Sequence, residues 1–261
     1  PTKRQPKPSS AGSNVYKRQM LERIVGEKWL TAKAVFGLWP ANSIGDDVRV
    51  QHPKGETTLH FLRQQVDKPA ERPDFCLADF IAPLDSGKQD WIGAFAVTAG
   101  IGIDAHVARF EAEHDDYNAI LLKALADRLA EALAERLHQR VRTEFWGHER
   151  AEALDNDALI DEQYRGIRPA PGYPACPEHS EKRRLFDLLQ AEANAGMELT
   201  ESFAMLPTAA VSGYYFSHPQ SQYFVVGRLS REQVSDYARR KGVDRAQAER
   251  WLASNLDYDP E

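Results

Sequence analysis

The chain has 261 residues and a hydrophobic fraction of 42%, which is enough for one large domain or two small ones with an ordinary buried core. A net charge of -6 and a pI near 5.8, without a basic face, argue against a nucleic-acid partner, so we expect partners that are proteins or small molecules. The sequence has no apolar run of about 18 residues and no signal-peptide pattern, which predicts a cytoplasmic protein without a membrane span.

Residues 1–19 are basic and rich in proline and serine, unlike the rest of the chain. Such a segment cannot bury enough apolar surface to fold, so we expect a disordered tail. The stretch from Val15 to Gln19 also resembles the translation of a sequencing-library adapter, which indicates a non-native tail. We therefore expect the folded domain to span residues 20–261.

Helix and strand patterns alternate in the first part of this domain. Apolar spacing predicts a helix at residues 20–29. Runs rich in β-branched and aromatic residues predict strands at residues 34–39, 48–51, 57–61 and 91–98. The first strand is expected to end at Pro40, and the next two form a hairpin around Pro53, Lys54 and Gly55. The last should be fully buried, because it is almost continuously apolar.

The strongest helical pattern lies between Asp115 and Trp146. Apolar residues recur there every three or four positions, namely Ile120, Leu121, Leu125, Leu129, Leu133, Leu137, Val141 and Phe145. A second helix is predicted at residues 180–195, where Gly196 stops it. Aspartates at 115 and 116 fit the N-terminus of the long helix, where carboxylates meet the helix dipole.

The C-terminal part predicts two strands followed by two helices. The strands are expected at residues 209–216 and 222–229, and Ser230 with Gln233 forms a capping box before short helices separated by Gly242. Hairpin strands and grouped helices predict an α+β single domain, with a mainly antiparallel twisted sheet flanked by helices that include one long helix.

Two cysteines, Cys76 and Cys176, are too few for a disulfide framework. Cys176 and His179 have Cys-x-x-His spacing, but a structural zinc site needs four ligands and no second pair is nearby. The sequence therefore predicts no metal site. Gly100 and Gly102 follow a strand, yet the third glycine and the βαβ unit of a Rossmann fingerprint are missing.

The most informative segment is residues 166–179, which contains four prolines and two glycines around Arg168, Tyr173 and His179. Proline lacks a backbone donor and restricts the preceding residue, so this segment can form neither a helix nor a central strand. We expect a rigid, irregular loop. Such a loop loses little entropy when a ligand binds, and it can hold a guanidinium and a phenol in place.

The pattern Arg-x-x-x-Gly-Tyr at Arg168, Gly172 and Tyr173 resembles the S-adenosylmethionine-binding signature of the activation domain of cobalamin-dependent methionine synthase. Further stretches, in order over residues 20–259, resemble the same domain: Gly37 to Ala41, Leu62 to Gln65, Cys76 to Pro83, His114 to Tyr117 and Leu199 to Met205. The resemblance implies a non-Rossmann S-adenosylmethionine site. It implies that cobalamin is bound by a separate domain of the same enzyme, and zinc by another. It also implies flavodoxin or an equivalent reductase as partner.

The resemblance assigns S-adenosylmethionine binding to Arg168, Gly172, Tyr173, Glu131, Tyr223 and Phe224. A guanidinium can hold the ligand's carboxylate through two hydrogen bonds, whereas the alternative is a surface arginine paired with a nearby acid. Glu131 suits a sulfonium and an ammonium, or it is a helix-surface partner of neighbouring charges. Tyr223 and Phe224 can stack on the ligand or belong to the core, and in a strand only one of them can face it.

The resemblance also assigns contact with the cobalamin-binding domain to His179, with a helix-start histidine as the alternative. Asp127 lies on the same long helix as Glu131, and we expect it to face this partner domain as well. An upstream aspartate of the family's ligand site has no match here, so we expect a truncated domain. No catalytic residue is predicted, and this fragment of a methyltransferase should not turn over alone. The alternative function is a docking module for a cobalamin-binding domain that no longer binds S-adenosylmethionine. A free-standing methyltransferase would need a general base, and the sequence indicates none.

Overall fold

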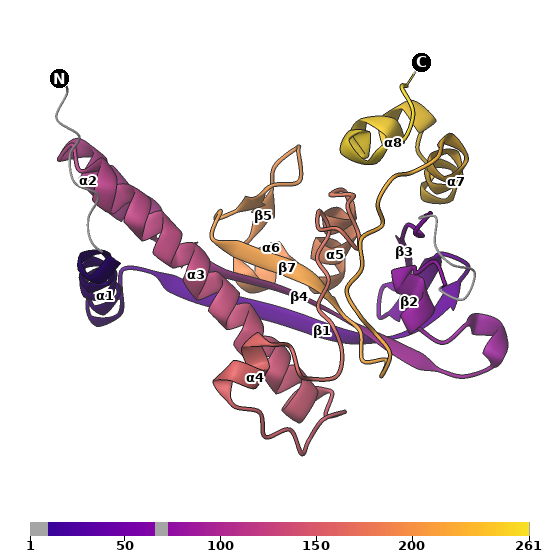
Figure 1. Cartoon of the computed structure of the whole chain (residues 1–261), viewed down its shortest axis with the longest axis horizontal. Coiled ribbons are helices and arrows are strands. Elements are labelled where there is room, and N and C mark those ends of the chain that lie inside the picture. The colour runs from indigo at the N-terminus through magenta and orange to yellow at the C-terminus, as the bar shows by residue number, and fades with distance from the viewer. Residues whose placement is uncertain (1–9, 66–72, 261) are drawn as a thin grey trace.

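The computed structural model describes residues 10–65 and 73–260 (Figure 1). Its centre is an antiparallel sheet in the order β3-β2-β1-β4-β7. The strands are β1 (Thr31–Ile44), β2 (Asp47–His52), β3 (Gly55–His60), β4 (Asp90–Ile101) and β7 (Ala210–Tyr215). His52 lies opposite Gly55, so the predicted hairpin is confirmed. The predicted α+β class with an antiparallel sheet is also confirmed.

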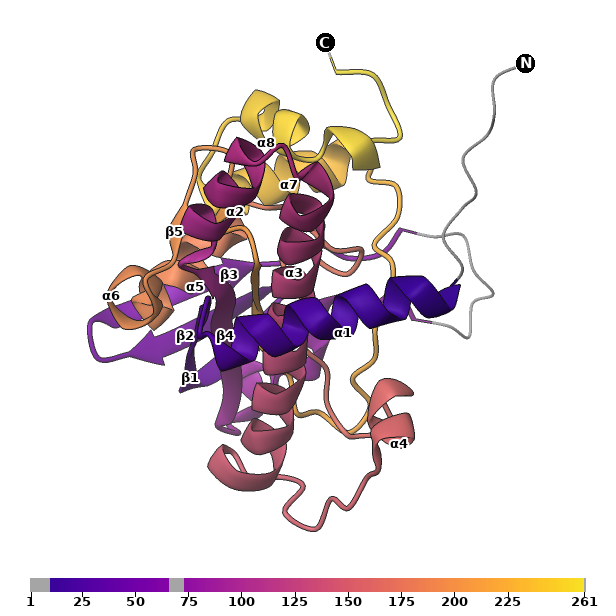
Figure 2. The same ribbon diagram turned by 90° about the vertical axis from the view of Figure 1, so that its left-hand side faces the viewer.

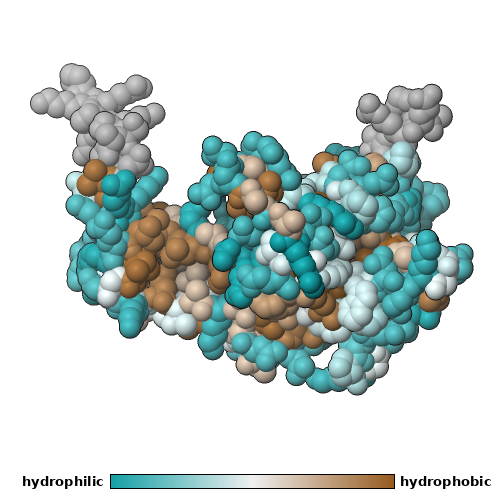
Figure 3. Space-filling model, turned by 90° about the horizontal axis from the view of Figure 1, so that it is seen from below, coloured by the Kyte–Doolittle hydropathy of each residue, from teal (hydrophilic) through white to brown (hydrophobic). Residues whose placement is uncertain are grey.

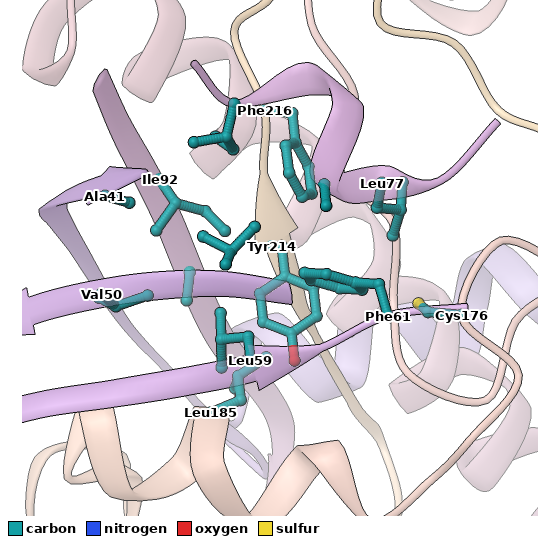
Figure 4. Packing of buried hydrophobic residues seen from close by; sticks show 14 of the residues in the cluster. Ala41, Val50, Leu59, Phe61, Leu77, Ile92, Cys176, Leu185, Tyr214 and Phe216 are labelled. Atoms are coloured by element: carbon teal, nitrogen blue, oxygen red, sulfur yellow. The ribbon is translucent and has the colours of Figure 1, made fainter. Parts of the chain in front are cut away.

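The β4 strand is buried on both faces, which explains its nearly continuous apolar sequence. Alternate residues serve two cores: Ala94 and Ala96 face one, and Phe95 and Val97 face the other. The first core packs under α5 (Glu181–Leu189), and Figure 4 shows Leu185 of this helix beside Leu59 and Tyr214. The second packs under the long helix α3 (Asp116–Arg140), which crosses the sheet in Figure 1.

Smaller elements surround this framework. α1 (Ser10–Gly26) and α2 (Ile103–Ala112) pack with α3 through a separate apolar cluster, and Figure 2 shows α1 lying across α3. The other elements are α4 (Asn156–Ile160), α6 (Ala191–Ala195), β5 (Glu198–Leu199), β6 (Met205–Leu206), α7 (Arg231–Lys241) and α8 (Arg245–Trp251). Among the described residues, no helix combines the length and apolar character that a membrane span requires.

The N-terminal prediction differs from the structure. α1 is continuous from Ser10, so the expected disorder does not hold for residues 10–19, and residues 1–9 lie outside the described part of the chain. Met20 and Ile24 anchor this helix, because they are buried against the cluster shared with α2 and α3. The buried residues of this helix thus lie in the range predicted to be helical, and Val15 and Tyr16 before them are exposed.

The β1 strand does not end at Pro40, which is a second correction. It continues to Ile44, because pairing with β4 carries it through Pro40 opposite Trp91. Pairing with β2 begins only at Ala41, so at Pro40 the strand is flanked on one side and the missing N–H is tolerated.

Figure 3 shows an exposed apolar patch beside α1 on the face seen from below.

The long helix is confirmed, and part of the predicted apolar series is buried, namely Leu121, Leu137 and Val141. Leu125, Leu129 and Leu133 are partly buried against the apolar clusters. The sequence pattern missed the small residues that follow Leu122 at intervals of four, namely Ala126, Ala130 and Ala134, which are also buried. Ile120 is 66% exposed. The helix changes to a π-helical turn at Val141–Phe145. Alanines let α3 lie close to the sheet, which a leucine stripe would prevent.

The predicted strand at residues 222–229 is wrong. These residues form an irregular segment whose backbone groups bond to loops and side chains. The Val226 N–H donates to the Pro174 carbonyl at 2.8 Å, and the Gln64 amide donates to the Val225 carbonyl at 2.7 Å. The segment thus lies against the proline-rich loop rather than in the sheet. The helix predicted at residues 180–195 is also divided, because Gln190 adopts a left-handed conformation between α5 and α6.

Candidate functional site

The start of the proline-rich loop is fixed onto the edge of the sheet. Ile167 and Phe216 exchange backbone hydrogen bonds of 3.0 and 3.1 Å, and the Tyr214 N–H donates to the Pro169 carbonyl at 2.9 Å. A Cβ at Gly213 would lie 2.6 Å from the Pro169 oxygen, so only glycine permits this approach. Arg168 is therefore held at a defined position beside β7.

The rest of the loop is a compact irregular turn, as predicted. The Gly172 N–H donates to the Cys176 carbonyl at 2.8 Å, and the Cys176 N–H donates to the Tyr173 carbonyl at 2.9 Å. The Cys176 thiol is free and buried, and it donates to the Ala170 carbonyl. Burial raises the pKa of this thiol. Cys176 therefore closes the turn as a neutral thiol.

A cavity of about 670 Å³ lies between this loop, α3 and residues 223–225. Five of the six residues predicted to bind the ligand line it: Arg168, Tyr173, Glu131, Tyr223 and Phe224. Gly172 supports the loop but is not part of the wall. Three segments that are distant in sequence, which carry Glu131, Arg168 with Tyr173, and Tyr223 with Phe224, thus meet at one cavity.

Arg168 is held by groups that the sequence did not identify. Its Nη2 pairs with Glu135, and its Nη1 donates to the Tyr164 hydroxyl and lies 3.4 Å from Nδ1 of His138. The backbone N–H of Arg168 donates to the Tyr223 hydroxyl at 3.0 Å. Glu135 and His138 lie four and seven positions after Glu131, so helical periodicity placed them on the same side of α3.

His138 is buried behind Arg168, with 1% exposure. Its ring stacks on Tyr215 with centroids 5.0 Å apart, and Tyr215 stacks on Phe95 at 4.7 Å. Burial, followed by the charges of Arg142 and Arg168, holds the pKa of His138 well below its ordinary value. His138 is therefore neutral and can accept a hydrogen bond from Arg168.

This burial predicts an acid-sensitive contribution to stability. The pKa of His138 is lower in the folded chain than in the unfolded chain, so its contribution is complete above about pH 6.5 and falls as the pH decreases towards the folded value. The free energy of unfolding should therefore be lower at pH 5.5 than at pH 7.5. Urea unfolding at both pH values should show a smaller loss for His138→Asn. An equal loss in the variant would contradict the assignment to His138.

Glu131 and the aromatic pair combine local contacts with a place in the cavity wall. Glu131 forms a 2.7 Å ion pair with Arg128, and both side chains are more than half exposed. Tyr223 reaches the backbone of Arg168, whereas Phe224 packs against Phe75 with centroids 5.9 Å apart. Because this segment is not a strand, both aromatic residues can line the cavity.

A second cavity, of about 220 Å³, adjoins the first and shares Glu131, Tyr173, Ala170 and Val211 with it. Asp127 and His179, the residues predicted to contact another domain, both line it. Partial burial and the charge of Glu131 raise the pKa of Asp127. Burial and the nearby Lys182 lower the pKa of His179. Lys182, a further wall residue, was not identified from the sequence.

Within the described ranges 10–65 and 73–260, no group of three or more histidine, cysteine, aspartate or glutamate side chains could hold a metal ion. Cys176 and His179, whose Cys-x-x-His spacing the sequence analysis did not assign to a metal, belong to no such group within these ranges. The cavities are instead lined by a guanidinium, carboxylates, aromatic rings and backbone, which suits an organic ligand.

Comparisons with known proteins give one consistent result. Residues 4–242 match the family described as the vitamin B12 dependent methionine synthase activation domain. A crystal structure described as the MetH reactivation domain bound to AdoHcy is 53% identical in sequence, with a TM-score of 0.91. The alignment covers 96% of this chain and 80% of that chain.

Proposed function

The chain belongs to the family of vitamin B12-dependent methionine synthase activation domains, and on this basis we propose that it binds S-adenosylmethionine in the cavity at Arg168. The proposed role is reductive remethylation of oxidised cobalamin, which restores methylcobalamin for the synthesis of methionine from homocysteine. The observation that carries the proposal is the convergence of Arg168, Glu131, Tyr173 and Tyr223 on one cavity.

The chemistry of the wall fits the ligand. S-adenosylmethionine carries a carboxylate, an ammonium, a sulfonium and an adenine ring. Arg168 would hold the carboxylate through charge-assisted hydrogen bonds. Glu131 and Glu135 would face the positive groups, and Tyr173 and Tyr223 offer aromatic faces for the adenine or the sulfonium. The solved relative with AdoHcy bound supports the same class of ligand.

The ion pair between Arg168 and Glu135 bears on how the carboxylate would bind. In the structure, Glu135 occupies Nη2 of Arg168, while Tyr164 and His138 face Nη1. An incoming carboxylate would share or replace Glu135 at this guanidinium. Tyr164 and His138 would keep the guanidinium in place during the exchange, because both lie on its other side.

We assign the second cavity to the contact with a cobalamin-binding domain of the same enzyme, through His179 and Asp127. When bound, S-adenosylmethionine would supply the methyl group, and flavodoxin or an equivalent reductase would supply the electron. The chain provides position and electrostatics. It is part of a cytoplasmic methyltransferase in this proposal, and it should not turn over alone because cobalamin, homocysteine and zinc would be bound by other domains.

Calorimetric titration of the folded chain with S-adenosylmethionine and with S-adenosylhomocysteine tests the proposal. We expect both to bind at one site, because they share the carboxylate, the ammonium and the adenine ring. Methionine and adenosine, titrated separately, should bind far more weakly, since each occupies only part of the cavity. A well-folded chain that binds neither ligand would contradict the proposal and favour a docking module without a ligand.

A further inference from the structure

The second cavity contains a buried ammonium beside an imidazole. Lys182 is 7% exposed, and its Nζ lies 2.8 Å from Nδ1 of His179 and 3.2 Å from the Phe203 carbonyl oxygen. No carboxylate of the described residues forms an ion pair with Lys182. The nearby Lys241 differs, because it pairs with both Glu178 and Glu181. Lys182 therefore depends on two uncharged acceptors.

The imidazole of His179 is held from another side by the proline-rich loop. Gly172 has a φ of +98°, and a Cβ at this position would lie 2.2 Å from Cε1 of His179. Any other residue would displace the ring. Gly172 and Lys182 together set the orientation of the imidazole, although the side chain itself is exposed.

The contact between Lys182 and His179 also decides where the imidazole carries its proton. An ammonium has only donors, so Nδ1 must offer its lone pair, and the single ring proton of a neutral imidazole then lies on Nε2. We propose that Lys182 is a positioning residue that fixes His179 as the neutral Nε2–H tautomer and so presents a hydrogen-bond donor at the second cavity. The inference deepens the proposed function, because it rests on the proposal that the second cavity contacts the cobalamin-binding domain.

The charges around His179 agree with this assignment. Lys182 on α5 and Glu178 in the loop act on it directly, and Asp127 and Glu131 face the cavity from α3. Glu178 bonds to Ser180, Tyr237 and Lys241 and forms no ion pair with Lys182, although its charge opposes the lowering of the pKa of both His179 and Lys182. Burial and Lys182 lower the pKa of His179, and burial lowers the pKa of Lys182.

The tautomer determines what His179 can recognise. A neutral Nε2–H donor requires an acceptor on the docking partner, such as a carboxylate, a carbonyl or the lone pair of another imidazole. Because burial and Lys182 disfavour the charged imidazole, this contact should not depend on pH above neutrality. A histidine that stays protonated at the same place would make docking weaken as the pH rises.

Long-range ¹H–¹⁵N NMR spectra of the histidine side chains test the proposal on the whole chain. We expect His179 to show a protonated Nε2 and an unprotonated Nδ1 at pH 8. In Lys182→Met, the two tautomers should mix, and the pKa of His179 should rise because the charge of Lys182 is removed. Arg183→Met is the matched control, because Arg183 is on the same helix and pairs with Asp187 instead.

Two results would overturn the proposal: a protonated Nδ1 in the unaltered chain, or an equal rise of the His179 pKa in Arg183→Met. If Lys182→Met does not fold, the spectrum of the unaltered chain still decides the tautomer. The measurement needs no ligand, so it is independent of the proposed function. If the unaltered chain shows the Nε2–H tautomer but does not bind S-adenosylhomocysteine, only the proposed ligand site is contradicted.

Discussion

Arg142→Met is expected to lower the free energy of unfolding by about 3–5 kcal/mol, because it leaves a buried carboxylate without its partner. Arg142 is 1% exposed, and its Nε and Nη2 donate to the carboxylate of Glu152 at 2.7 and 2.8 Å. The Glu152 side chain is also buried. Chemical unfolding, followed by circular dichroism, measures the loss.

A surface pair on the same helix provides the control. Arg140 and Glu144 form an ion pair in which both side chains are nearly half exposed, so Arg140→Met should cost much less stability than Arg142→Met. The double variant Arg142→Met with Glu152→Leu should regain much of the lost stability, because no unpaired charge remains in the interior. A loss below about 1 kcal/mol in Arg142→Met would show that the buried pair contributes no more than the surface pair.

The buried pair of Arg142 and Glu152 is also connected to Arg168. The guanidinium of Arg142 lies 3.7 Å from the ring centroid of Tyr164, and the Tyr164 hydroxyl accepts a hydrogen bond from Arg168. Glu152, Arg142, Tyr164 and Arg168 therefore form a continuous series of contacts from the segment after α3 to the cavity. Variants of Arg142 that still fold should bind the ligand more weakly than variants of Arg140.

Arg168→Met should weaken the binding of S-adenosylhomocysteine by about 30-fold or more, which corresponds to about 2 kcal/mol for a lost charge-assisted interaction with the carboxylate. S-adenosylmethionine should lose the same factor, because its carboxylate is identical. Arg168→Lys keeps the charge but not the planar pair of donors. Its affinity for S-adenosylhomocysteine should therefore lie between those of the unaltered chain and Arg168→Met. Calorimetric titration gives all the dissociation constants.

Arg136→Met is the matched control, because Arg136 is exposed on α3 and bonds to Gln139 rather than lining the cavity. Its affinity should remain that of the unaltered chain. Full affinity in a folded Arg168→Met variant would remove Arg168 from the site. A loss that differs between the two ligands would instead indicate that Arg168 acts on the charge at sulfur.

Much of the fold follows from local patterns in the sequence. The hairpin of β2 and β3 follows from a short turn between β-rich runs, and the buried strand β4 from its continuous apolar residues. The start of α7 follows from Ser230, whose side chain accepts from the Gln233 N–H. Each of these features is encoded within a few neighbouring residues, so sequence spacing is enough to predict it.

Other elements depend on contacts between distant segments. β1 continues through Pro40 because β4 pairs with it, and α1 is held in place where Met20 and Ile24 are buried in a cluster with residues of α2 and α3. Residues 222–229 have a strand-like composition, but loops and side chains take their backbone hydrogen bonds. Local propensity cannot predict these hydrogen-bond partners, because they are distant in the sequence.

The sequence by itself determined the α+β class, the rigid irregular loop and the position of Arg168 within it, because prolines and glycines restrict the backbone locally. Only the tertiary structure decided what surrounds that arginine. Glu135, Tyr164 and His138 reach Arg168 through the packing of α3 on the sheet, and Lys182 reaches His179 through the turn into α5. Charges and proton positions depend on three-dimensional neighbours and burial, which no local pattern encodes.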